Sequence, residues 1–119
     1  MKLKLIAAVD KSKEWRLDYD EVRPASEGLS VVKRDLMYGF VDEEGQEVIP
    51  TKFLDARPFS GGRAAVKLFG TKWGYIDKKG DVAVPIQYEE VDNYFHNGRA
   101  LVKLNGHLFY IDVDGNRLV

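Results

Sequence analysis

The chain repeats itself three times with a period of about 35 residues. The repeats start at Tyr19, Phe53 and Tyr88, and the small differences in their lengths fall between the units, where turns are expected. A turn aspartate and a turn glycine recur in every unit, each 35 residues from the next: Asp42, Asp77 and Asp112, and Gly45, Gly80 and Gly115. A period of this length is typical of stacked structural units, each of which buries its apolar surface against its neighbours.

We expect one β-repeat domain over residues 1–119. Residues 1–18 align with the second half of a unit, and three nearly whole units follow at 19–52, 53–87 and 88–119. A chain of this size is long enough to bury one core and rarely divides into two.

Each unit carries the pattern of three short strands. The first two runs are β-rich and are joined by a turn, which in the third unit is the hairpin-forming pair Asn105-Gly106. The turn aspartate and glycine then lead into a third run, and Pro50 and Pro85 are expected to end it because proline has no N–H. The first runs are Leu29–Lys33, Ala64–Leu68 and Ala100–Leu104, and the third runs are Glu47–Ile49, Val82–Val84 and Arg117–Val119. The expected fold is all-β: stacked three-stranded antiparallel β-meander repeats, in an open solenoid-like stack or a propeller-like array.

Aromatic residues recur on the second strand of each unit. Because side chains alternate along a strand, Trp73 and Tyr75 share one face, and Tyr38 has the position of Trp73 in the first unit. We expect these rings to form a core, and the alternative is an exposed platform for a peptide or a sugar ring. Gly39 and Gly74 would permit a close backbone approach on the opposite face.

These residues give the chain a family resemblance. Residues 56–85, with Lys72-Trp73-Gly74-Tyr75-Ile76-Asp77 at their centre, resemble the WG repeat family, also called KWG repeats. The first unit has Tyr38-Gly39-Phe40 at this place, and the third has Leu108-Phe109-Tyr110 and so lacks both signature letters. The resemblance implies repeated β units found in bacterial proteins of mostly undefined role. It implies no reaction and no catalytic residue.

Composition argues against several partners and reactions. The chain has 18 basic and 19 acidic residues and no cysteine, so we expect no nucleic-acid partner, no membrane surface and no thiol chemistry. His96 and His107 lack the spacing of metal ligands. The stretch that begins at Asp112 starts like a calcium loop but has Arg117 where glycine is required. We therefore expect no metal, no cofactor and no enzymatic activity.

The charged residues also recur from unit to unit. The acids Asp20, Glu21, Glu89 and Glu90 and the lysines Lys33, Lys67 and Lys103 stand at equivalent positions, which favours a structural or solvated role over a hydrolytic pair or a basic stripe. The apolar run Leu5–Val9 is too short for a signal peptide or a membrane span. We expect a cytoplasmic protein, or a fragment of a larger one whose targeting segment lies elsewhere.

The predicted function is a non-enzymatic binding or scaffolding module for another protein, since stacked repeats present an extended surface. The predicted contact residues lie in the irregular connecting segments, where the units differ: Arg57, Arg63, Tyr94, Phe95, His96 and Arg99. The alternative is a domain that binds a glycan or a cell-wall polymer through its aromatic residues. Self-association through exposed strand edges at the incomplete end units is a further possibility.

Overall fold

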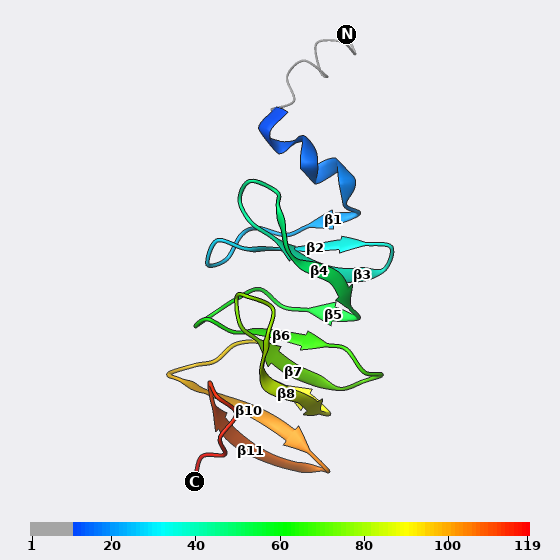
Figure 1. Cartoon of the computed structure of the whole chain (residues 1–119). Helices are drawn as coiled ribbons and strands as arrows, with labels where there is room; N and C mark the ends of the chain where they lie inside the picture. Colours follow the sequence, from blue (N-terminus) through cyan, green and yellow to red (C-terminus); the bar gives the residue numbers. More distant parts are fainter. Residues whose placement is uncertain (1–10) are drawn as a thin grey trace.

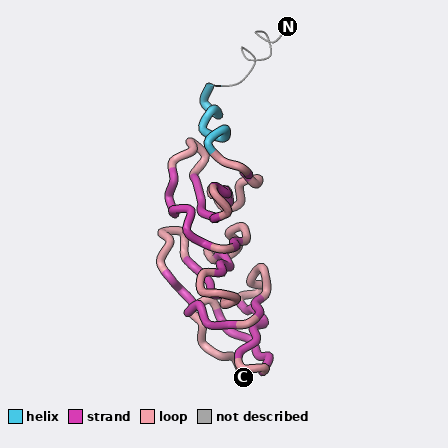
Figure 2. Tube along the Cα trace, turned by 90° about the vertical axis from the view of Figure 1, so that its right-hand side faces the viewer, coloured by secondary structure: helices cyan, strands magenta, loops and turns pink. Residues whose placement is uncertain are grey.

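The protein is an elongated stack of three β-sheets, as a computed structural model that describes residues 11–119 shows (Figures 1 and 2). The sheets follow one another along the long axis in chain order, with the N-terminal helix at one end and the C-terminus at the other. The sheets do not close into a barrel, so the predicted all-β repeat fold is confirmed in its open form. No helix within residues 11–119 has the length and apolarity needed to cross a membrane.

Neighbouring strands within each sheet pair in antiparallel fashion. The first sheet contains β1 (Glu21–Val22), β2 (Ser30–Arg34), β3 (Met37–Val41) and β4 (Glu47–Phe53). The second contains β5 (Asp55–Ala56), β6 (Ala64–Lys67), β7 (Trp73–Ile76) and β8 (Val82–Tyr88). The third contains β9 (Glu90–Val91), β10 (Arg99–Leu104) and β11 (His107–Asp112). The first two sheets thus have four strands where three were predicted, because the start of each connecting segment pairs with the following strand.

The prediction that the prolines end the third strands is wrong. Strands β4 and β8 continue through Pro50 and Pro85, and each bulges away from the ladder there. The predicted close approach at the glycines is confirmed, because a Cβ atom on Gly39 would lie 2.5 Å from the carbonyl oxygen of Ile49. The bulge at the proline and the glycine opposite it therefore form one structural device.

The third sheet lacks the equivalent last strand. The strand predicted over Arg117–Val119 is absent, and only an isolated bridge joins Ile111 to Arg117. Phe109 stands where the other two sheets have glycine, and no β-strand with a proline bulge lies opposite it within the described residues. A side chain at this position is therefore tolerated.

The sheets pack face to face through two apolar clusters. Phe40 faces the second sheet and packs edge-on against Phe59, with ring centroids 4.9 Å apart. Tyr75 faces the third sheet and packs against Phe95 at 4.7 Å. Phe40 and Tyr75 are almost fully buried, so the prediction that the recurring aromatics form a core is confirmed for both. Trp73 is only half-buried at the rim of the second cluster.

The turn aspartates hold their own hairpins as predicted. Asp42 Oδ1 accepts hydrogen bonds from the N–H groups of Glu44 and Gln46, at 3.0 and 2.9 Å, and Asp77 and Asp112 repeat this pattern. The glycines Gly45, Gly80 and Gly115 take the left-handed conformation. Backbone donation from Asn116 lowers the pKa of Asp112 below its ordinary value, since these hydrogen bonds favour the ionised carboxylate.

The N-terminal half unit differs from the prediction. Residues 1–10 of that half unit lie outside the described residues, and residues 11–18, which align with the second half of a unit, form the 3₁₀ helix η1 (Lys11–Asp18). The ring of Trp15 lies directly over Gly45, because a Cβ atom there would be 2.1 Å from Trp15 Cγ. The helix thus contacts the first sheet at its turn glycine.

Candidate binding groove

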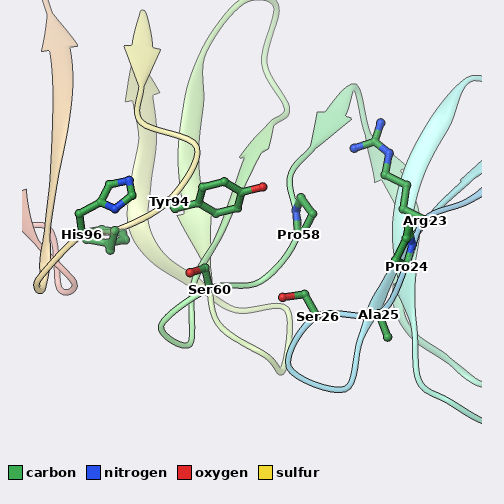
Figure 3. Close-up of a pocket in the computed structure, with 9 residues that line it drawn as sticks. Arg23, Pro24, Ala25, Ser26, Pro58, Ser60, Tyr94 and His96 are labelled. Atoms are coloured by element: carbon green, nitrogen blue, oxygen red, sulfur yellow. The ribbon is translucent and has the colours of Figure 1, made fainter.

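A groove runs along one edge of the stack where the connecting segments of all three sheets come together (Figure 3). It encloses about 500 Å³. The residues that line it come from equivalent parts of the repeat: Arg23, Pro24, Ala25 and Ser26 from the first, Pro58 and Ser60 from the second, and Tyr94, Phe95 and His96 from the third. Stacking therefore builds a continuous surface from segments that are far apart in the sequence.

Backbone hydrogen bonds fix the shape of each connecting segment. The N–H and C=O groups of Ser26 and Leu29 pair with each other, and so do those of Ser60 with Arg63 and of His96 with Arg99. Ser26 Oγ also donates to the carbonyl oxygen of Phe59 at 2.6 Å, which links the first segment to the second. The groove is thus largely preformed, which reduces the entropy lost when a ligand binds.

The groove presents apolar rings beside hydrogen-bonding groups. The Tyr94 ring stands out from the third connecting segment with its hydroxyl toward Pro58, and it is 38% exposed (Figure 3). The Ser60 hydroxyl and the His96 ring lie nearby on the same side of the stack (Figure 3). Among residues 11–119, no carboxylate lines the groove. Its chemistry suits an uncharged or extended ligand that offers both apolar groups and hydrogen-bond partners.

Arg23 closes one end of the groove and is held in place by its neighbours. Its Nε donates to Glu21 at 2.6 Å, and one of its terminal nitrogens donates to the carbonyl oxygen of Ala56 at 3.1 Å. The guanidinium also lies over the Tyr38 ring, 5.3 Å from its centroid. Arg23 therefore links the first two sheets at the rim of the groove, where the Glu21 carboxylate offsets its charge.

Three of the six predicted contact residues lie in the groove. Tyr94 and His96 line it with their side chains (Figure 3). Phe95 also lines it, although its ring packs into the core against Tyr75.

The three predicted arginines lie elsewhere and make contacts within the protein. Arg57 Nε donates to Asn93 Oδ1 at 3.0 Å, and its guanidinium lies over the Trp73 ring. Arg63 reaches the third sheet and donates to the carbonyl oxygen of Val113 at 2.8 Å. The Arg99 guanidinium lies over the Tyr110 ring, 4.2 Å from its centroid. Two of these side chains thus hold neighbouring sheets together.

Sequence reasoning missed the part of the groove that comes from the first two sheets. It selected residues from the second and third connecting segments, whereas Pro24 and Ser26 of the first segment line the groove together with their equivalents Pro58 and Ser60. Stacking of equivalent segments was itself predicted. Adding the equivalents of Tyr94 and His96 in the other two units would have identified these residues.

Two of the recurring acids, Asp20 and Glu89, accept hydrogen bonds from backbone N–H groups. Glu89 accepts hydrogen bonds from the N–H groups of Asn105 and Gly106, both at 3.0 Å, and donation from Gly106 is the largest cause of its lowered pKa. Asp20 accepts from the N–H group of Asp35 at 3.1 Å. These carboxylates therefore stabilise the β-hairpin turns. Within residues 11–119, no group of three His, Asp or Glu side chains is placed to hold a metal ion.

Comparison with known proteins agrees with this repeat architecture. The profile of the family described as WG containing repeat matches the chain twice, at residues 38–70 and 73–106. No curated protein matches the chain. The two family matches together cover more than half of the 119 residues, and each spans the turn and strand pattern of one repeat. The chain therefore belongs to the WG containing repeat family and is a β-repeat module.

Proposed function

We propose that the chain is a non-enzymatic binding module that holds an extended segment of a partner protein in the groove. The observation that carries the proposal is the groove itself, because equivalent segments of three stacked sheets form one continuous surface of about 500 Å³. Volumes of this order are typical of ligand sites in proteins.

The lining favours a peptide over a sugar polymer. The proline rings and Tyr94 offer apolar contacts, and Ser60 and His96 offer hydrogen bonds, which together match the alternating side chains and backbone groups of an extended peptide. The glycan alternative relies on the recurring aromatic residues, of which Phe40 and Tyr75 are buried and Trp73 is half-buried with the Arg57 guanidinium over its ring. The recurring acids, which a hydrolase would need in a cleft, have other partners: Asp20 and Glu89 accept from turn N–H groups, and Glu21 and Glu90 pair with Arg23 and Lys103.

A displayed library of random peptides tests the proposal directly. The full chain is used as bait, and we expect it to enrich peptides that share a motif. Tyr94→Ala removes the exposed ring, and Ser60→Trp fills the groove, so each variant should lower the affinity for the enriched peptides about tenfold or more.

Phe69→Ala is the matched control, because Phe69 is an exposed aromatic residue between β6 and β7 and does not line the groove. This variant should bind the peptides as the wild type does. If no motif is enriched, or if the peptides bind the two groove variants unchanged, the proposal is wrong. Binding of soluble oligosaccharides with the same sensitivity to Tyr94→Ala, and no binding of peptides, would support the glycan alternative instead.

A further inference from the structure

Tight turns with two consecutive residues in the left-handed conformation recur along the stack. Within residues 11–119 there are five of them: Glu27-Gly28, Asp35-Leu36, Gly61-Gly62, Asn97-Gly98 and Asn105-Gly106. The backbone hydrogen bonds of such a turn join the two flanking residues, so the N–H groups of its two central residues are left over. Adjacent N–H groups of this kind can bind an anion.

Three of the five turns are bound by a carboxylate of the protein itself. The pairs are Glu27 with Gly61-Gly62, Glu89 with Asn105-Gly106, and Asp20 with Asp35. Glu27 uses both of its oxygens, which lie 2.7 Å from the nitrogen of Gly61 and 2.9 Å from that of Gly62. A carboxylate is therefore the group with which this fold satisfies the amides of its tight turns.

The turn Asn97-Gly98 has the same shape but no bound carboxylate, and we call it the free turn. Its φ angles are 54° and 76°, against 62° and 77° at Gly61-Gly62. Both of its residues are exposed, and no group within residues 11–119 accepts a hydrogen bond from either N–H. The reason lies in the sequence, because the residue with the position of Glu27 in the second unit is Gly61, which has no side chain.

The two junctions between neighbouring sheets have matching geometry. The buried ring of one sheet packs against a phenylalanine of the next with ring centroids 4.9 Å apart at the first junction and 4.7 Å apart at the second. A Cβ atom on the turn glycine would lie 3.2 Å from the preceding sheet at Gly80 and 3.4 Å from it at Gly115. A carboxylate placed at the second junction as Glu27 is at the first would therefore lie against the free turn.

A positive charge accompanies the bound carboxylate at the first junction, and the second junction supplies one from another position. Lys78 Nζ lies 3.5 Å from Glu27 Oε1. Val113 has the position of Lys78 in the third unit, and Arg63 Nε donates to its carbonyl oxygen at 2.8 Å. The acidic partner of Arg63 is mostly exposed, at 71%. A carboxylate at the free turn would thus meet a cation, as Glu27 does.

The turn Glu27-Gly28 also has no carboxylate bound to its amides within the described residues, but its surroundings are acidic. Glu27 belongs to the turn itself, and Glu43 has the position that Lys78 has in the second unit. A further carboxylate would be repelled there, since like charges disfavour ionisation of each other. The free turn is therefore the better anion site of the two.

The free turn adjoins the groove, because it directly follows His96, which lines the groove together with Tyr94. We propose that the N–H groups of Asn97 and Gly98 bind a carboxylate of the peptide held in the groove. That carboxylate comes from an aspartate or glutamate side chain or from the C-terminus of the peptide, since both offer the same two oxygens. The inference rests on the proposed function and adds an acidic group to its ligand.

Neutralising the acids of the bound peptide tests the inference. The full chain selects peptides from a library displayed with free C-termini, and the consensus peptide is synthesised with each acidic side chain replaced by its amide, or with a C-terminal amide. Calorimetric titration should show a loss of affinity of about tenfold or more for one of these forms, because hydrogen bonds to a charged group are among the stronger ones. The form that loses affinity identifies the source of the carboxylate.

The failures of the two proposals differ in this experiment. If peptides are enriched but none of the neutral forms binds more weakly, the groove binds peptides and the inference is wrong. If no peptide is enriched, the proposed function is wrong and the inference falls with it.

A substitution at Gly61 tests the free turn from the side of the protein. Gly61→Glu gives the second unit the residue that the first unit has in Glu27, which adopts a φ of 55°. A Cβ atom on Gly61 would have nothing within 4 Å, so the site has room for it. The new carboxylate should occupy the free turn and lower the affinity for the acidic peptide about tenfold.

Two control variants separate charge and position from the effect of adding a side chain. Gly61→Gln has the same size without the charge, so it should lower the affinity by less than about threefold. Gly70→Glu adds the same charge at a glycine with a φ of 56° and nothing within 4 Å, away from the groove, and it should bind the peptide as the wild type does.

Nuclear magnetic resonance of these variants gives a readout that needs no peptide. In Gly61→Glu the amide proton signals of Asn97 and Gly98 should shift downfield and follow the titration of the new carboxyl group between about pH 3 and 6, whereas in Gly61→Gln they should stay as in the wild type. Equal amide shifts in the two Gly61 variants, or equal losses of peptide affinity in Gly61→Glu and either control, would overturn the inference.

Discussion

The first and third sheets are built from the same repeat, but the side chains that point away from the second sheet have different surroundings. At the N-terminal end, helix η1 lays Trp15 across the turn glycine Gly45. At the C-terminal end, the third sheet exposes Leu108 and Tyr110, which have the positions of interface residues in the other sheets. The comparison shows that equivalent parts of a repeat can be covered in one unit and exposed in another, because each unit packs only against its own neighbours.

Turn glycines explain how a helix can replace a strand at the first end. A Cβ atom on Gly80 would lie 3.2 Å from Ile49 Cγ1, and one on Gly115 would lie 3.4 Å from Val84 Cγ1. Each turn glycine is thus contacted by an apolar side chain from the preceding sheet. Trp15 makes the same contact with Gly45, so the helix delivers an apolar group where a preceding sheet would deliver one.

The largest predicted effect is the loss of stability when a side chain is added at Gly74 in the second sheet, which we compare with the equivalent position in the third sheet. In Gly74→Ala the new Cβ atom would lie 2.7 Å from both Ile86 Cα and the carbonyl oxygen of Val84, so two strands must move apart. We expect a loss of about 2–3 kcal/mol in the free energy of unfolding. Urea denaturation followed by circular dichroism measures it.

The equivalent position in the third sheet provides the contrast. Phe109→Ala removes a half-buried ring that packs edge-on near Tyr88, so we expect a smaller loss of about 1–2 kcal/mol. An equal or larger loss for Phe109→Ala would mean that the bulge opposite Gly74 adapts easily, and that the two positions do not differ as described.

The second prediction compares the two ends directly. Trp15→Ala removes the ring that lies over Gly45, and we expect it to lower the free energy of unfolding by about 2 kcal/mol, roughly half the cost of deleting a fully buried tryptophan. Leu108→Ala in the third sheet, where the side chain is 63% exposed, should change it by no more than about 0.5 kcal/mol. Similar losses for both variants would mean that Trp15 contributes no more to stability than an exposed side chain does.

The third prediction compares a covered tyrosine with an open one. Burial raises the pKa of Tyr75, and its hydroxyl donates to the carbonyl oxygen of Asp92. Tyr75→Phe should therefore lower the free energy of unfolding by about 1 kcal/mol, since it leaves a buried acceptor unpaired. Tyr110→Phe should leave that free energy unchanged, and thermal unfolding of the two variants side by side distinguishes these outcomes.

Much of the fold could be predicted because the repeat places local signals at fixed intervals. The turn at Asp77 and Gly80 depends only on neighbouring residues, and the role of Gly74 follows from alternation along one strand. Helix η1 could not be predicted in this way, because residues 11–18 align with part of a repeat in sequence but form a helix instead of strands. The continuation of β4 through Pro50 was missed because it depends on the glycine of the neighbouring strand.

The candidate site, like the fold, could be predicted from the sequence only in part. Tyr94 and His96 were found because connecting segments on a repeat scaffold are natural contact sites. Arg57 and Arg63 were predicted to contact a partner because they lie in a connecting segment, yet they bond to Asn93 and Val113, which lie 36 and 50 residues away. Contacts between sheets depend on how the units rotate against each other, and one sequence does not contain that information.

The smallest predicted effect is the pH dependence of the contact between the first two sheets at Glu27. Burial opposes ionisation of Glu27, but donation from the N–H groups of Gly62 and Gly61, together with Lys78 at 3.5 Å, lowers its pKa below the ordinary 4.5. Because the pKa is lower in the folded state, ionised Glu27 stabilises the fold fully above pH 4.5, and this contribution is lost as the pH falls through the folded pKa.

Glu27→Gln should therefore be less stable than the wild type near neutral pH, and the difference should shrink as the pH falls from about 7 to about 3. Urea denaturation at several pH values measures this difference. Asp112→Asn is the comparison at the other end, where the carboxylate holds only its own turn; its effect should have the same sign but should leave the junction between the first two sheets intact. Hydrogen exchange at Gly61 and Gly62 reports that junction, and faster exchange in Asp112→Asn than in Glu27→Gln would contradict the assignment.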